Sequence, residues 1–107
     1  MIRDEDIEKA IDYLEKSAVN ASQARANRIY LEGYSKTLKA MLMKKFPEHS
    51  ISAQEREALA HPEYQHHLDG LKVAVEEDER HRFLRVAMEA KIEAWRSHSA
   101  NIRAIKI

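Results

Sequence analysis

Turn-forming residues are scarce in this chain, which limits the folds open to it. Its 107 residues include two glycines, Gly33 and Gly70, and two prolines, Pro47 and Pro62. A β-rich or α/β domain of this length needs many more turn residues. Charged residues make up 34% of the sequence and apolar residues 44%, and the commonest types are good helix formers. The composition therefore predicts an all-α fold in one domain, residues 1–107.

The prolines divide the chain into helical segments. Pro47 ends a first long segment, because proline cannot continue a helix. Ser52 and Glu55 form a capping-box pattern that opens a short helix, and Pro62 suits the first turn of the next helix. The predicted helices span about residues 4–45, 52–60 and 62–103.

Apolar residues recur along both long segments in steps of three and four. In the first segment they are Ile7, Ile11, Leu14, Ala18 and Ala21, then Ala24, Leu31, Leu38 and Met41/Leu42. In the third segment one stripe is Tyr64, Leu68, Leu71, Val75, Phe83, Ala87, Ala90 and Ala94. The charged stretch 76–82 between its two parts is expected to be a solvated turn or two of helix. This spacing indicates two amphipathic helices that pack through coiled-coil-like seams.

A pair of antiparallel helices is the simplest arrangement of these segments. Folding the chain about its middle gives a long hairpin with the short helix at its tip. In this register Leu14 lies near Trp95, and Leu38 lies near Leu71. We therefore predict that Trp95 packs against Leu14 inside the hairpin, with exposure of Trp95 at a binding surface as the alternative.

A second apolar stripe on the third segment is left over by this pairing. A two-helix hairpin buries one face of each helix, and exposed apolar patches mark interfaces. We therefore expect a homodimer that forms a four-helix bundle. The alternative is a monomer whose long helices break near Gly33 and Gly70. The predicted interface residues are Leu84, Met88, Ile92, Trp95 and Ile102.

The sequence contains few residue patterns typical of catalysis, cofactor binding or metal binding. The chain has no cysteine, and it holds neither a nucleophile–base motif nor a glycine-rich phosphate loop. We therefore expect no enzymatic activity and no cofactor. A metal-binding helical bundle is a lesser alternative, because Asp78 and His81 share a helical face near the level of Glu32. The six histidines show no other metal-ligand spacing; they are His49, His61, His66, His67, His81 and His98.

The charge balance limits the classes of partner. Eighteen basic residues match eighteen acidic ones, so the formal net charge is zero, unlike a histone-like nucleic-acid coat. A local basic stretch leaves one alternative open. Residues 96–107 contain Arg96, Arg103 and Lys106 and no acid. These three residues are the candidates for nucleic-acid contact, in a DNA-binding accessory protein for recombination or replication.

The sequence carries no sign of a membrane or secretory destination. No apolar run approaches the roughly 18 residues of a membrane span, and the first residues lack signal-peptide character. A cytoplasmic protein without membrane contact is therefore expected.

Several segments in the second half resemble small helical proteins encoded in tailed-phage and prophage genomes, often near recombination genes. The resemblance rests on Ser52–Ala60, Glu63–Tyr64 with Leu68, Glu93–Ser97 and Asn101–Arg103. It implies a phage accessory factor in the host cytoplasm, with Trp95 and Arg96 as contact residues, and it transfers no catalytic residue. Together with the surplus apolar stripe, it predicts a non-enzymatic interaction module that binds a host or phage protein.

Overall fold

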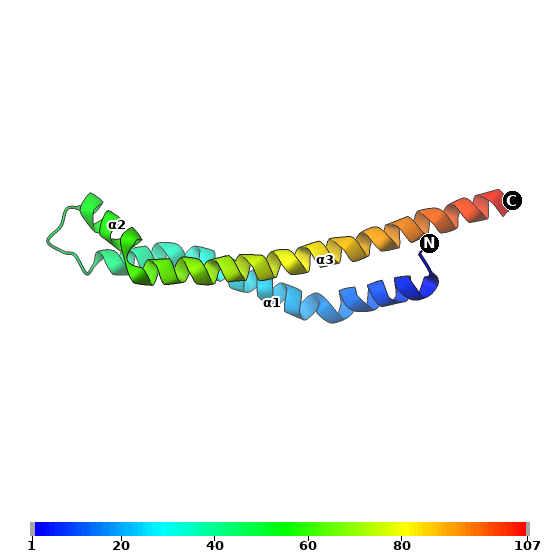
Figure 1. The fold of residues 1–107 in the computed structure, drawn as a ribbon, viewed down its shortest axis with the longest axis horizontal. Helices are drawn as coiled ribbons and strands as arrows, with labels where there is room; N and C mark the ends of the chain where they lie inside the picture. The colour runs from blue at the N-terminus through cyan, green and yellow to red at the C-terminus, as the bar shows by residue number, and fades with distance from the viewer. Residues whose placement is uncertain (1, 107) are drawn as a thin grey trace. The chain divides into compact units, whose positions relative to one another are not determined.

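The structure, a computed structural model, describes residues 2–106 and contains three α-helices in that range (Figure 1). They are α1 (Asp4–Met43), α2 (Ile51–Ala60) and α3 (Pro62–Lys106). The described residues form no β-strand. The predicted all-α hairpin with a short helix between its two long helices is confirmed.

The helix ends differ slightly from the predicted bounds. Helix α1 stops at Met43 rather than near residue 45, because Lys45 and Phe46 donate turn-type hydrogen bonds to Leu42 and Met43. Helix α3 continues to Lys106, beyond the predicted end at residue 103.

The N-cap of α2 is Ser50, not Ser52. Ser50 has an extended backbone, and its hydroxyl accepts a hydrogen bond from the Ala53 amide at 3.3 Å. Ser52 lies inside the first turn, so the predicted capping box does not form. Glu55 instead forms an ion pair with Lys39 of α1. The Glu55 carboxylate, which the sequence pattern assigned to the capping box, is thus held by an ion pair with another helix.

Packing groups the chain into two units, which we describe separately. Unit 1 combines the part of α1 up to Ser22 with the part of α3 from Glu79 onward. Unit 2 spans Gln23–Asp78 and includes all of α2.

The core of unit 2 lies where its three helices meet. Leu38 and Leu42 of α1 cluster with Ala58 of α2, and Tyr64 of α3 packs against them. Leu42 is only 1% exposed. Because α2 covers the open side of the α1–α3 pair here, apolar side chains are removed from water completely.

The rest of unit 2 is a two-helix seam with steps of three and four residues. The inward positions of α1 are Ala24, Arg28, Leu31, Ser35, Leu38 and Leu42, and those of α3 are Tyr64, His67, Leu71, Ala74 and Asp78. Asp78 belongs to the stretch predicted to be solvated, but it is buried and its carboxylate lies 3.0 Å from the Arg28 guanidinium. This ion pair compensates the charges that the seam encloses.

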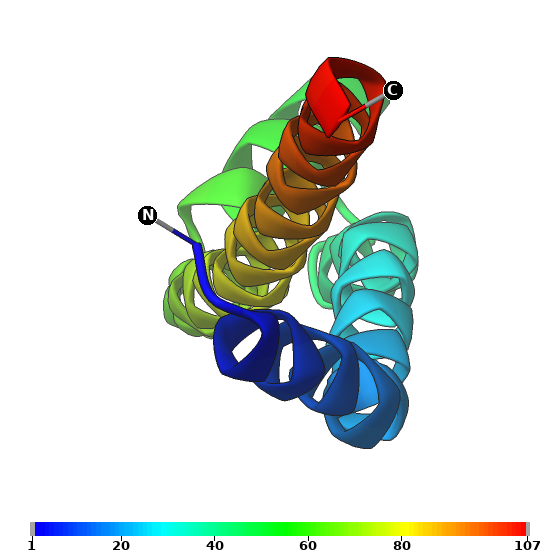
Figure 2. The ribbon, with the colours of Figure 1, turned by 90° about the vertical axis from the view of Figure 1, so that its right-hand side faces the viewer.

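Unit 1 continues the same spacing with two helices only; Figure 2 has this unit toward the viewer. Its inward positions on α1 are Ile7, Ala10, Leu14, Ser17 and Ala21, and those on α3 are His81, Arg85, Met88, Ile92, Trp95 and Ser99. Only Ile7 and Ala10 are buried apolar residues among the described part of this unit.

The register of unit 1 differs from the predicted one. The Trp95 indole donates a hydrogen bond to the Asp4 carboxylate at 2.9 Å. The Arg85 guanidinium, rather than Trp95, reaches Leu14, where it donates to the main-chain carbonyl at 2.9 Å. The two helices are therefore offset along their axes relative to the prediction, and a different stripe of α3 turns inward. The stripe predicted to pack there is exposed; it comprises Phe83, Ala87, Ala90 and Ala94.

Candidate functional site

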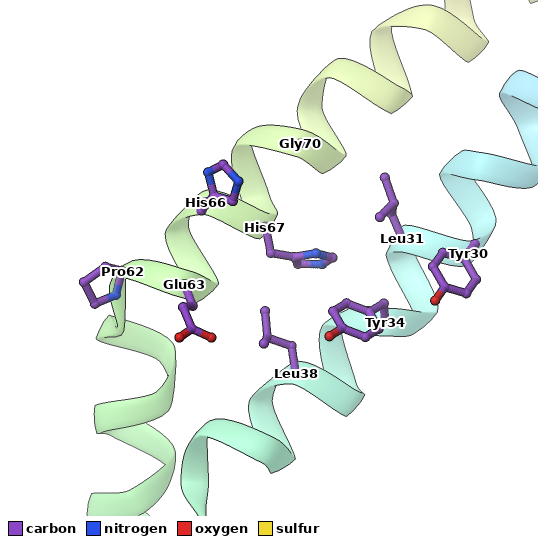
Figure 3. A pocket seen from close by; sticks show the side chains of 9 residues that line it. All are labelled: Tyr30, Leu31, Tyr34, Leu38, Pro62, Glu63, His66, His67 and Gly70. Atoms are coloured by element: carbon purple, nitrogen blue, oxygen red, sulfur yellow. The ribbon is translucent and has the colours of Figure 1, made fainter. Parts of the chain in front are cut away.

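An open groove of about 660 Å³ lies between α1 and α3 in unit 2 (Figure 3). Its walls are two rows of side chains, one from each helix. The lining residues are Tyr30, Leu31, Tyr34, Leu38, Pro62, Glu63, His66, His67 and Gly70.

Helical spacing explains how these residues come together. Tyr30, Tyr34 and Leu38 are four residues apart, so they form one row along α1. Gly70 lies on the facing part of α3, where a Cβ atom would meet no other atom within 4 Å. The missing side chain leaves the space open.

Aromatic rings dominate the α1 wall. The rings of Tyr30 and Tyr34 stack with centroids 6.2 Å apart, and the His67 ring lies 5.6 Å from Tyr34. Figure 3 shows His67 extending from α3 toward α1. The His67 imidazole is hydrogen-bonded through Nε2 to the Ser35 hydroxyl at 2.7 Å. His67 thus connects the two walls and is itself buried.

Two polar side chains of the groove already have partners inside the protein. His67 is held by Ser35, and the Glu63 carboxylate accepts a hydrogen bond from the Lys45 ammonium at 3.3 Å. Besides these two side chains, the lining offers apolar surface, two tyrosine hydroxyls and the exposed His66 imidazole to a bound molecule.

The two carboxylates of the metal alternative contact a cation of the protein itself. Asp78 pairs with Arg28 at 3.0 Å, and Glu32 lies 3.5 Å from the same guanidinium. Within the range 2–106, no group of three or more His, Cys, Asp or Glu side chains is arranged to hold a metal ion.

The residues predicted to form an interface lie in unit 1. Met88, Ile92 and Trp95 are half-buried in the seam with α1. Leu84 and Ile102 are more open, each 36% exposed. The structure therefore does not bring the five residues together as one exposed stripe.

The candidates for nucleic-acid contact lie near the end of α3. Arg96 is exposed and pairs with Glu93 on the same helix at 3.1 Å. Arg103 is exposed as well. The side chain of Lys106 lies outside the described part of the chain.

Sequence reasoning missed the groove because Tyr30 and Tyr34 lie outside the apolar stripes that it considered. The available signal was the four-residue spacing of the two tyrosines on a segment that also contains Gly33. Pairing them with Gly70 required the hairpin register, which the sequence pattern gave only approximately.

No helix among the described residues is long and apolar enough to span a membrane. No protein-family model matches the chain, and neither curated proteins nor solved structures show significant similarity to it. The groove and the exposed surfaces around it therefore carry the functional argument.

Proposed function

We propose that the protein is a non-enzymatic interaction module whose unit 2 groove binds an amphipathic helix of a partner protein. The observation that carries this proposal is the apolar, aromatic-lined groove itself. Tyr30 at its edge is 68% exposed. Tyrosine is among the residues that contribute most to protein interfaces, so an exposed tyrosine at this position suits a binding site.

The direction and spacing of the walls favour a helix as the occupant. The row of Tyr30, Tyr34 and Leu38 follows the axis of α1, and Glu63, His66 and Gly70 follow the facing surface of α3. A helix placed between these rows would present apolar residues at i, i+3 or i+4, and i+7. Ridges of its side chains would then fill the space that Gly70 leaves.

A third helix already packs on the same pair elsewhere in unit 2. Ala58 of α2 is fully buried against Leu38 and Leu42. The α1–α3 pair is therefore stabilised by a third helix packed on it, and Leu38 of that contact also lines the groove.

The internal partners of the polar side chains argue for protein binding over catalysis. A general acid or base must reach the proton that it transfers. His67 is buried and bonded to Ser35, and Glu63 is paired with Lys45. These groups shape the walls of the groove and hold its two helices together.

Site-specific photocrosslinking in the source cells tests the proposal. A benzoylphenylalanine at position 66, which is exposed on the rim of the groove, is expected to form an adduct with one different protein. The matched control is position 72, which is exposed on α3 and does not line the groove.

Adding Gly70→Lys to the position 66 variant is expected to abolish the adduct, because the lysine chain would occupy the groove. Circular dichroism should show unchanged helix content, since the new side chain meets no other atom at its Cβ. No adduct at position 66, or equal adducts at positions 66 and 72, would contradict the proposal.

A further inference from the structure

The outer surface of α1 in unit 2 carries no charge over its whole length, in a chain that is 34% charged. On a helical projection, ten exposed or half-exposed residues share this surface, which we call the uncharged face. They are Gln23, Ala26, Asn27, Ile29, Tyr30, Gly33, Tyr34, Thr37, Ala40 and Met41.

Nine of the ten residues of the uncharged face are exposed, because they point away from the seam with α3. Tyr34, at the edge of the face, is half-buried through its contact with His67. Met41 is 54% exposed and Ile29 is 50% exposed. Apolar side chains gathered on one exposed surface mark an interaction site.

The small residues along this face are symmetric about Gly33. Ala26 lies seven residues before Gly33 and Ala40 seven residues after it. Seven residues are close to two helical turns, so the three positions form one line along the helix. A Cβ atom at Gly33 would meet nothing within 4 Å, so the internal packing of the chain does not explain this mid-helix glycine.

From this symmetry we infer that a second copy of the chain covers the uncharged face, with the two α1 helices antiparallel about a two-fold axis at Gly33. That axis places Gly33 against the partner subunit's Gly33, and Ala26 against the partner subunit's Ala40. Small residues at these three contact points let the two helices approach closely, to the short end of the usual range of about 8–10 Å between helix axes. One surface serves both copies, as an isologous interface requires.

Charges along the edge of the face fit the same arrangement. Glu32 and Lys36 both border the uncharged face, on the side away from Tyr30. In the antiparallel pair, like edges meet, and Glu32 lies within one helical turn of the partner subunit's Lys36. The symmetry repeats this pairing, so each interface gains two opposite-charge contacts, which favour this partner and orientation.

This dimer differs from the one expected from the sequence, because it uses α1 rather than the stripe of α3 around Met88. It adjoins the groove, because Tyr30 and Tyr34 belong to both surfaces. Gly33 belongs to the dimer contact and Gly70 to the groove, so the two proposals can fail independently.

Sedimentation analysis of the full chain tests the inference, using the two glycines as a matched pair. We expect a dimer at micromolar concentration. Gly33→Lys should weaken dimerisation at least about tenfold, because it places two like charges at the centre of the contact. Gly70→Lys, the same change in the middle of the other long helix, should leave dimerisation unaltered.

Charge exchange tests the orientation. Glu32→Lys and Lys36→Glu should each weaken the dimer, and the double variant should restore it, since it recreates both pairs with reversed signs. Circular dichroism of each variant separates loss of association from loss of folding.

Disulfide trapping tests the position of the axis, because the chain has no cysteine of its own. Gly33→Cys should oxidise to a covalent dimer. Ala26→Cys and Ala40→Cys should crosslink only when mixed, and Lys72→Cys should stay monomeric. A monomeric wild type, a dimer insensitive to Gly33→Lys, or equal crosslinking at position 72 would overturn the inference.

Discussion

Units 1 and 2 use the same two long helices and the same spacing, but they bury different side chains. In unit 2, Leu38 and Leu42 meet Ala58 of α2 in a closed apolar core. In unit 1, the inward positions of α3 are half-buried, apart from the buried His81. The comparison shows that coiled-coil spacing alone does not make a core. Among the described apolar residues of unit 1 only Ile7 and Ala10 are buried, whereas the third helix of unit 2 encloses Leu38, Leu42 and Ala58 together.

The polar residues of the two seams also differ in their partners. In unit 2, Arg28 is matched by Asp78 and His67 by Ser35. In unit 1, Arg85 donates to the main-chain carbonyl of Leu14 and the hydroxyl of Ser17. Both seams are therefore crossed by side-chain pairs, which in unit 1 include Trp95 with Asp4, and Arg85 of unit 1 also contacts the main chain.

Truncation of the closed core gives the largest expected difference between the units. Leu42→Ala should lower the free energy of unfolding by about 3 kcal/mol, because it leaves a cavity among fully buried side chains. Leu14→Ala, the matched change in the half-buried seam of unit 1, should cost about 1 kcal/mol. Urea denaturation followed by circular dichroism measures both values, and equal losses would show that α2 does not create the difference.

Removal of the buried carboxylate in unit 2 is expected to have the next largest effect. Asp78→Ala should cost about 2 kcal/mol, because it removes the buried carboxylate that contacts the Arg28 guanidinium in the seam. Combining Asp78→Ala with Arg28→Ala should cost less than the two separate losses together. A double-mutant cycle measures this coupling. Strictly additive losses in the free energy of unfolding would show that the two side chains do not stabilise each other.

The N-terminal contact of unit 1 should have a smaller effect. Asp4→Asn removes the negative acceptor of the Trp95 indole and should destabilise unit 1 by about 1 kcal/mol. Trp95 is the only tryptophan of the chain, so its fluorescence reports on this contact directly. We expect the fluorescence transition in urea to shift more than the circular-dichroism transition, to which the helices of unit 2 also contribute. Glu5→Gln, an exposed neighbour without this contact, is the control.

The smallest expected effect is a gain in stability from a substitution in the groove. Gly70→Ala should stabilise unit 2 by about 0.5–1 kcal/mol, because alanine is the better helix former and its Cβ meets no other atom. Thermal unfolding measures the change. A loss of stability would mean that the glycine serves packing inside unit 2 rather than access to the groove.

The fold class followed from simple features of the sequence. Two prolines mark the ends of the helices because proline cannot continue one, and steps of three and four residues require amphipathic helices. The N-cap of the short helix was predicted at Ser52 instead of Ser50, because Ser52, two residues later, has the same local pattern. Glu55 could have closed the predicted box at Ser52, but the tertiary pair with Lys39 holds its carboxylate instead.

The two stripes of α3 differ in the size of their apolar side chains. The outward stripe has Phe83 and three alanines, whereas the inward stripe has Met88, Ile92 and Trp95. The inward stripe is the one that continues the spacing of His67, Asp78 and His81. Sequence reasoning placed Asp78 and His81 in a solvated stretch, because it could not see that Arg28 lies opposite Asp78.

By itself, the sequence determined that this protein is made of two long helices and one short helix, because helix formation and termination depend on residues close along the chain. Tertiary structure decided which faces turn inward and where the groove lies. Those features depend on side chains far apart in sequence, such as Ser35 with His67 and Arg28 with Asp78, which meet only once the helices have a register.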